Sequence, residues 1–295
     1  MGTPRPIRCA PSPPPAETLK TFSASDAALD GLRVLRAHWR VVAGWSVFNL
    51  VALVAMVIFT VIAIFIAAAT AGSREAASAA GGLIGGLVGG IGALVIELVV
   101  VCGVFRLLLR PEEPAFLHLR LGADEARLGL VWLILGVPFI ALVAGVVAAM
   151  ASVGAFAGIA TLAVVGPALL YVGVRLSLAA PATFAARRLA LPDSWRATRG
   201  RVSAILGMIA LALCVLAFLA LSIWLVLALA FTAASGFRDW GLVSLSDVGA
   251  LETRPLAYLA QLLIQLMLAP VLWVISQAPL VYAWKALRPA NSDAP

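Results

Sequence analysis

Residues 41–69 read VVAGWSVFNLVALVAMVIFTVIAIFIAAA, a stretch without a single Asp, Glu, Lys or Arg. About 20 predominantly apolar residues are enough for a helix to cross the roughly 30 Å hydrocarbon core of a bilayer. Lipid offers no water to the backbone N–H and C=O groups, and a helix satisfies both within the segment itself. The stretch therefore predicts a transmembrane helix.

Five further stretches share this length and apolar character. The six predicted spans are residues 41–69, 81–105, 128–150, 159–180, 203–231 and 256–284. Within them the only charged residues are Glu97, in the second span, and Arg175, near the end of the fourth. We expect an all-α fold, a polytopic membrane bundle of six transmembrane helices that occupies residues 27–288.

The composition of the 295-residue chain excludes other classes of protein. Hydrophobic residues make up 63% and charged residues 12%, and the mean hydropathy is +1.06. Soluble globular proteins have about 45–50% apolar and about 25% charged residues. The three cysteines, Cys9, Cys102 and Cys214, are too few and too scattered for a disulfide scaffold. A water-soluble fold and a wholly disordered chain are both excluded.

The positions of Lys and Arg predict the orientation in the membrane, because cytoplasmic loops carry the excess of positive charge. With the N-terminus inside, only Arg74, Arg238 and Arg254 of the 21 basic residues lie outside. The opposite orientation would place the arginine cluster of residues 187–201 outside. We therefore predict that both termini are inside and that the spans form three helical hairpins.

The two ends of the chain are predicted to be tails on the cytoplasmic side. Residues 1–26 are rich in proline and have little apolar surface to bury, which is typical of a disordered segment. Residues 289–295 form a short second tail.

Two inner segments share a pattern of Asp, an apolar residue and two arginines. DGLRVLRA at residues 30–37 precedes the first span, DSWRATRG at residues 193–200 precedes the fifth, and residues 119–127 match only loosely. Arginines three or four apart share one face of a helix, and such a face can bind lipid phosphates at the membrane surface. The alternative is that these arginines only mark the inner side. The candidate interfacial residues are Arg33, Arg36, Trp195, Arg196, Arg199 and Arg201.

The second span combines small residues with a carboxylate. Its two adjacent rows at a spacing of four are Gly81, Gly85 and Gly89, and Gly82, Gly86 and Gly90. Such rows allow a neighbouring helix backbone to approach closely, either within the chain or in a second copy. Glu97 lies within about 20° of the second row at 100° per residue. It is therefore expected to face protein, either as a functional carboxylate or as a purely structural one.

The polar residues of the inner halves of the spans suggest a cluster. Arg175 is the nearest candidate base for Glu97 by depth, and Asn49 and Gln277 lie at similar depths in their own spans. We expect these four intramembrane residues to be the candidates for a polar site, with an ion pair between Glu97 and Arg175 as a hypothesis.

Motifs for catalysis and cofactor binding are missing from the sequence. There is no P-loop, dinucleotide fingerprint, Gly-x-Ser-x-Gly or HExxH motif, and the only histidines, His38 and His118, lie at membrane boundaries. We expect no catalytic residues, no cofactor and no metal site. The net charge of +7, concentrated on the inner side, favours anionic phospholipids as partners over nucleic acid.

Two short motifs carry a resemblance to a bacterial family. RLSLAAPAT at residues 175–183, followed by the segment at 193–200, resembles uncharacterised inner-membrane proteins that are similar to the membrane domain of glycerophosphoryl diester phosphodiesterases and to the YciC-like group. PAFLHLRLGADE at residues 114–125 is similar to alphaproteobacterial members. The resemblance covers residues 106–207 and implies a six-helix module in the bacterial inner membrane. The phosphodiesterase catalytic domain is absent, so its activity is not implied.

These observations predict an integral inner-membrane protein that is not an enzyme. The first interpretation is a scaffold or accessory module that binds anionic lipid or another membrane protein through its basic inner segments; a second copy of the chain is a further candidate partner. The alternative is a small-solute, ion or proton-coupled transporter or channel that uses Glu97. An intramembrane enzyme comes third, because one carboxylate without a second acid, a metal set or a nucleophile and base is too little for catalysis.

Overall fold

The computed structural model describes residues 23–113, 116–234 and 253–287, and within them it contains helices and no strand. Six helical stretches are long and apolar enough to cross a membrane, so the predicted all-α fold with six such helices is confirmed. They are α2 (Trp39–Thr70), α3 with η1 and α4 (Arg74–Ile84, Gly85–Gly89 and Gly90–Leu109), α5 (Ala123–Ser152), α6 (Ala155–Leu176), α9 (Val202–Ala234) and α11 (Pro255–Leu287).

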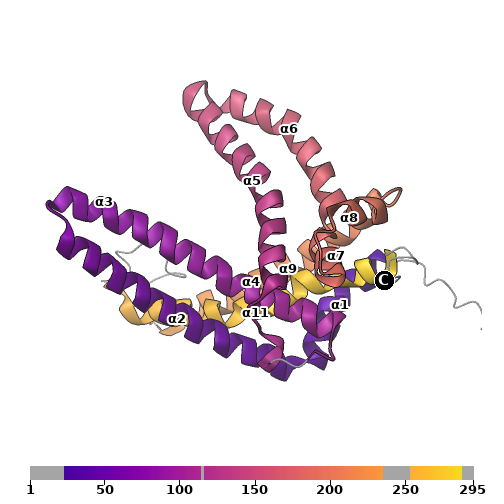
Figure 1. Cartoon of the computed structure of the whole chain (residues 1–295), viewed down its shortest axis with the longest axis horizontal. Coiled ribbons are helices and arrows are strands. Elements are labelled where there is room, and N and C mark those ends of the chain that lie inside the picture. Colours follow the sequence, from indigo (N-terminus) through magenta and orange to yellow (C-terminus); the bar gives the residue numbers. More distant parts are fainter. Residues whose placement is uncertain (1–22, 114–115, 235–252, 288–295) are drawn as a thin grey trace, which may run out of the picture.

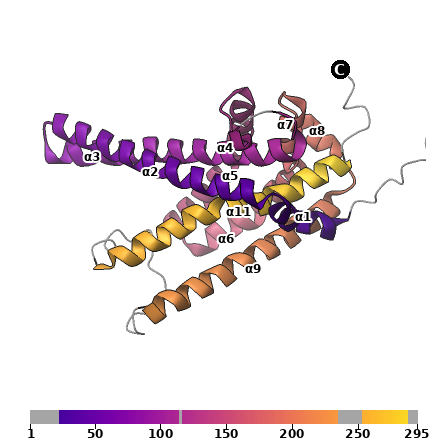
Figure 2. The same cartoon turned by 90° about the horizontal axis from the view of Figure 1, so that it is seen from below.

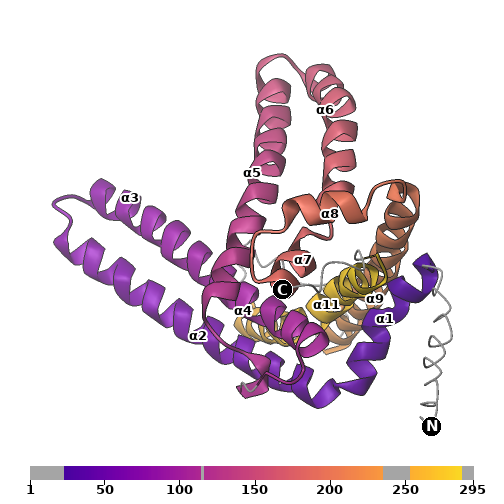
Figure 3. The same ribbon diagram turned by 45° about the vertical axis from the view of Figure 1, so that its right-hand side comes forward.

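Four short elements lie between or before the long helices. These are α1 (Ala24–Ala37), η2 (Phe116–His118), α7 (Ala179–Ala186) and α8 (Leu191–Ala197). They gather at one end of the molecule, together with the C-terminal end of α11 (Figure 3). Every described Lys and Arg belongs to this end except Arg74 and Arg254. We call it the basic end; it is the end predicted to be cytoplasmic.

The long helices pair as three hairpins, and these converge at the basic end. The tips of the α2–α3 hairpin and the α5–α6 hairpin point away from each other (Figure 1), and α9 with α11 runs in a third direction (Figure 2). Helix α11 packs against α1, α2, α4 and α9, and so lies at the centre of the arrangement. Within the described residues, the hydrogen bonds that join the α5–α6 hairpin to other helices are made by Asp124, Glu125 and Arg175 at its inner ends.

The buried side chains are concentrated where the three hairpins converge. The largest fully buried apolar side chains, among them Trp45, Phe105, Phe184 and Met208, are all toward the basic end. The outer halves of the spans expose large apolar side chains such as Phe65 and Phe156. In a bilayer the lipid tails cover such surfaces, so the contacts at the basic end are what position the hairpins relative to each other.

Helix α1 begins earlier than the sequence predicts. The Ser23 hydroxyl accepts a hydrogen bond from the Asp26 N–H at 3.3 Å and caps the first turn, so residues 24–26 are helical and do not belong to a disordered tail. Burial raises the pKa of the Asp30 carboxyl on the same helix. The remainder of that predicted tail, and the tail predicted at 289–295, lie outside the described residues.

Candidate functional site

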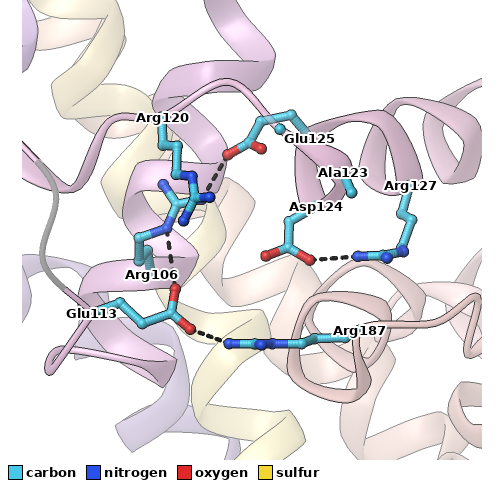
Figure 4. A pocket seen from close by; sticks show the side chains of 9 residues that line it. Arg106, Glu113, Arg120, Ala123, Asp124, Glu125, Arg127 and Arg187 are labelled. Atoms are coloured by element: carbon cyan, nitrogen blue, oxygen red, sulfur yellow. Dashed lines mark hydrogen bonds and ion pairs between the residues drawn. The ribbon is translucent and has the colours of Figure 1, made fainter.

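A pocket of about 460 Å³ opens at the basic end, where the link from α4 to α5 folds back over the ends of both helices. Around it, Asp124 and Arg127 face Arg106 and Glu113 across the pocket (Figure 4). The lining residues are Arg106, Glu113, Arg120, Gly122, Ala123, Asp124, Glu125, Arg127 and Arg187.

The backbone that frames the pocket is strained and held in place by two side chains. Leu117 and His118 both have left-handed backbone angles, with φ of 51° and 60°, which non-glycine residues rarely adopt. The Trp45 Nε1 on α2 donates to the Leu117 carbonyl at 2.7 Å, and Arg106 Nη1 donates to the His118 carbonyl at 2.5 Å. These two donors tie the link to α2 and α4.

A buried ion pair closes one wall of the pocket. Arg106 Nη2 lies 2.7 Å from Glu125 Oε1, and the two side chains are only 2% and 3% exposed. The Nε of Arg106 lies 3.7 Å from Glu113 Oε2 and is buried without a hydrogen-bond acceptor. Because α4 supplies the guanidinium and α5 the carboxylate, this pair joins the inner ends of two membrane-spanning helices.

A second group of charges surrounds Arg110, at the end of α4. Its Nη1 donates to Asp124 Oδ2 at 3.1 Å, its Nη2 donates to the Phe184 carbonyl, and its guanidinium lies 4.7 Å from the centre of the Phe184 ring. Asp124 also accepts from Arg127 at 2.7 Å. These contacts connect α4, α5 and α7.

The pocket has an excess of hydrogen-bond donors. Four arginines and three carboxylates line it, and each carboxylate already pairs with at least one arginine. Arg120 is exposed and has no hydrogen bond or ion pair within the described ranges. Helix α5 begins at this pocket after Gly122, and no side chain caps its first N–H groups. Such an arrangement is suited to an anion.

The sequence alone does not predict this pocket, because residues 119–127 match the interfacial pattern only loosely. The feature of the sequence that points to the pocket is a high density of charge. Eight of the 22 residues at 106–127 are charged, whereas the six predicted spans together contain two charged residues. Alternating Arg and carboxylate beside a membrane span indicates a paired network, but pairing partners depend on how the link folds.

A further arginine is buried on the other side of the basic end. Arg175 is 5% exposed, and its guanidinium lies 4.3 Å from the centre of the Trp195 ring. No ion pair to Arg175 occurs in the described part of the chain, and its Nε is buried without an acceptor. The Arg175 carbonyl accepts from Ser194 Oγ at 2.9 Å and Thr198 Oγ1 at 3.2 Å, which fixes α8 against α6.

The predicted interfacial arginines fall into two groups. Arg33 pairs with Asp26 and Arg196 with Asp193, each at 3.0 Å and on the surface. The hydrogen bond from the Arg33 guanidinium, with one involving Ser23, holds the pKa of the Asp26 carboxyl below its usual value. Of the predicted interfacial arginines, Arg36, Arg199 and Arg201 are exposed and have no ion pair within the described chain.

The four predicted intramembrane residues are not brought together. Asn49 Nδ2 donates to the Leu266 carbonyl at 2.7 Å and joins α2 to α11, while Gln277 Nε2 lies 3.4 Å from Ser276 Oγ beside it. Glu97 is half-buried and has no hydrogen bond or ion pair within the described residues. The hypothetical pair of Glu97 with Arg175 is absent, because Arg175 faces Trp195.

The two glycine rows have different surroundings. A Cβ placed on Gly81 or Gly85 would lie 3.4 or 3.6 Å from Ile64 of α2, so this row packs within its own hairpin, with Gly89 near Thr60. The other row, Gly82, Gly86 and Gly90, has nothing within 4 Å. Within the described part of this chain no helix contacts this row, so a contact with a second copy stays a prediction. An apolar groove of about 710 Å³ lies here, with η1 and the start of α4 on one side and α5 on the other.

Comparison of the chain with protein-family models, with curated proteins and with solved structures gave no match. Within the described residues no group of three or more His, Cys, Asp or Glu side chains is placed to hold a metal ion. Fold and site together define the class of this chain, a multi-pass all-α membrane protein with a charged pocket at its basic end.

Proposed function

We propose that the protein is a non-enzymatic scaffold or accessory module of the bacterial inner membrane that binds anionic phospholipid through its basic end. Another membrane protein is the alternative partner for the same basic segments. The resemblance to the membrane domain of glycerophosphoryl diester phosphodiesterases and to the YciC-like group is part of this proposal.

The observation that carries the proposal is the surface around α8. Arg199 and Arg201 are exposed without a carboxylate partner in the described chain, beside the partly exposed ring of Trp195. Arg175 is buried beneath that ring without a counter-ion. Lipid phosphates at the headgroup level supply anions for the exposed Arg199 and Arg201, and they add negative potential close to the buried Arg175 charge. Tryptophan is enriched at the same level of the membrane.

Neutralising the α8 surface should reduce the enrichment of anionic lipid. Each basic residue near an anionic leaflet contributes about 1 kcal/mol, so we expect replacement of Arg196, Arg199 and Arg201 by Gln to weaken the association about 100-fold. The measurement is the ratio of phosphatidylglycerol to phosphatidylethanolamine that co-purifies in lipid particles, relative to the bulk membrane. Arg74→Gln, on the opposite side, is the control. Equal enrichment in the triple variant and in wild type would contradict the proposal.

One observation favours a second function, that of a proton- or ion-coupled transporter. Glu97 lies within a span and has no partner among the described residues, as expected of a carboxylate that exchanges a proton or an ion. A transporter would show proton flux in proteoliposomes that Glu97→Gln abolishes and Glu75→Gln, at the outer tip, leaves intact. A scaffold would show no flux above empty vesicles and would keep its lipid and protein partners in the Glu97 variant.

A further inference from the structure

The charged pocket and the apolar groove lie on the same two helices. The pocket is lined by the end of α4, by residues 123–125 and 127 of α5, and by Gly122 just before that helix. The groove begins at Ala126 and continues along Gly129, Leu130 and Leu133 of α5, opposite α4. From Ala123 to Leu133 is ten residues, or about 15 Å along the helix axis. That length equals about half the thickness of the hydrocarbon core.

The pocket offers the chemistry that recognises a phosphate group. Arg120 has no partner among the described residues, Arg127 and Arg187 reach the rim from two further elements, and the uncapped first turn of α5 presents backbone N–H groups. The carboxylates are occupied by arginines, so they leave the exposed guanidinium of Arg120 uncompensated. Arg106, nine-tenths buried, lines the same space with an Nε that lacks an acceptor.

The groove offers the chemistry that accepts a hydrocarbon chain. It is lined entirely by Gly, Ala, Leu and Ile, and nothing lies within 4 Å of the missing Cβ positions at Gly86 and Gly90. These two glycines leave space on η1 and α4 that no side chain of the described residues fills. A free phosphate would use the pocket alone, whereas a phospholipid would use both features.

We propose that the protein holds one phospholipid of the inner leaflet at a defined site, with its phosphate in the pocket at Arg120 and Arg127 and an acyl chain in the groove between α4 and α5. The inference rests on the proposed function in one respect, that the basic end faces the leaflet rich in anionic lipid. The site itself is separate from the α8 surface.

The headgroup part is tested by titrating delipidated full-length protein in detergent with phosphatidylglycerol and counting bound lipids by native mass spectrometry. We expect one lipid to bind more tightly than the rest, and Arg120→Gln to weaken that lipid about 10-fold or more, the loss of one hydrogen bond to a charged group. Because Arg120 is exposed and unpaired in the described chain, the variant should unfold at the wild-type temperature. Unchanged binding in Arg120→Gln would overturn the site.

The acyl-chain part is tested in the same titration with two glycine-to-leucine variants, one in the groove and one outside it. Gly90→Leu places a side chain in the groove, and we expect it to weaken the tight lipid about 10-fold, equivalent to about two buried methylene groups. Gly136→Leu is the matched control, because Gly136 lies on α5, also has nothing within 4 Å, and does not line the groove. Equal binding in the two leucine variants would overturn the assignment of the groove.

Soluble probes identify the source of the phosphate. Inorganic phosphate and glycerol phosphate should compete with the tight lipid only at concentrations far above that of the lipid itself. Competition at equal concentration would show a free-phosphate site and overturn the lipid assignment. The triple α8 variant should keep the tight lipid and lose only bulk enrichment. The two experiments can therefore disagree. If Arg120→Gln loses the tight lipid while the triple variant keeps the enrichment of anionic lipid, the proposed function is contradicted and this inference stands.

Discussion

Glu125→Gln should lower the free energy of unfolding by about 3–5 kcal/mol, the cost of removing one partner from a buried ion pair. The Arg106 guanidinium would then be 2% exposed, with a neutral amide at 2.7 Å where the carboxylate had been. Its other contacts are the His118 carbonyl and the more distant Glu113 carboxylate. Neither replaces a charge-assisted hydrogen bond of good geometry.

The measurement is unfolding of the protein in detergent, followed by circular dichroism. Asp26→Asn is the matched control: it makes the same change from carboxylate to amide in the ion pair with Arg33, which is exposed to water. Surface ion pairs contribute little, so the control should unfold close to wild type. Equal free energies of unfolding for the two variants would contradict the prediction that the buried ion pair stabilises the protein.

The Glu125 variant should also loosen one hairpin selectively. Within the described residues, the hydrogen bonds from the α5–α6 hairpin to other helices lie at its inner ends, where this pair joins α5 to α4. Amide hydrogen exchange in the first turns of α5 should therefore accelerate more than exchange in α2 or α11. Uniform acceleration across all helices would instead indicate global destabilisation.

Gly31→Ala should destabilise the protein by about 1–3 kcal/mol, as overpacking of a tight contact does. A Cβ at Gly31 on α1 would lie 2.7 Å from the Ile275 Cα and 2.8 Å from its carbonyl oxygen on α11. Both are backbone atoms, which cannot rotate away as a side chain can. The helix axes must therefore separate, and the gain of about 1 kcal/mol that alanine normally brings to a helix is outweighed.

The comparison for this variant is Gly207→Ala on α9, where nothing lies within 4 Å of the new methyl group. That variant should be as stable as wild type or slightly more stable. Protease cleavage after Arg33 and Arg36 reports directly on α1, because a separated helix becomes a substrate. A Gly31 variant with the stability and cleavage rate of the Gly207 variant would contradict the contact between α1 and α11.

How far the sequence predicts this protein depends on the kind of interaction. The spans follow from composition. A stretch such as residues 41–69 is too apolar to be stable in water, and in lipid it satisfies its backbone hydrogen bonds as a helix. The lengths of α2, α9 and α11 agree with that argument. The glycine rows were visible too, but only the structure shows that Gly81 faces α2 and Gly90 faces an open groove.

The polar residues show the limit most clearly. Glu97 and Arg175 have similar depths in their spans, and depth was all that the sequence offered for pairing them. In the structure Arg175 stacks on Trp195, and the strong ion pair is formed by Arg106 and Glu125 at the ends of α4 and α5. Pairing depends on the rotation of each helix about its axis and on the path of the link, neither of which hydropathy specifies.

The sequence by itself determined that this chain is an all-α membrane protein with six apolar helices and its basic residues on one side. Each of these properties depends on the summed hydropathy or charge of a segment, so it does not depend on which other residues the segment contacts. Tertiary structure alone decided that the hairpins meet at one end, that α1 contacts α11 at Gly31, and that a charged pocket adjoins an apolar groove. Those features arise from atoms far apart in the chain, whose proximity is set by packing of helix ends and closure of the link between α4 and α5.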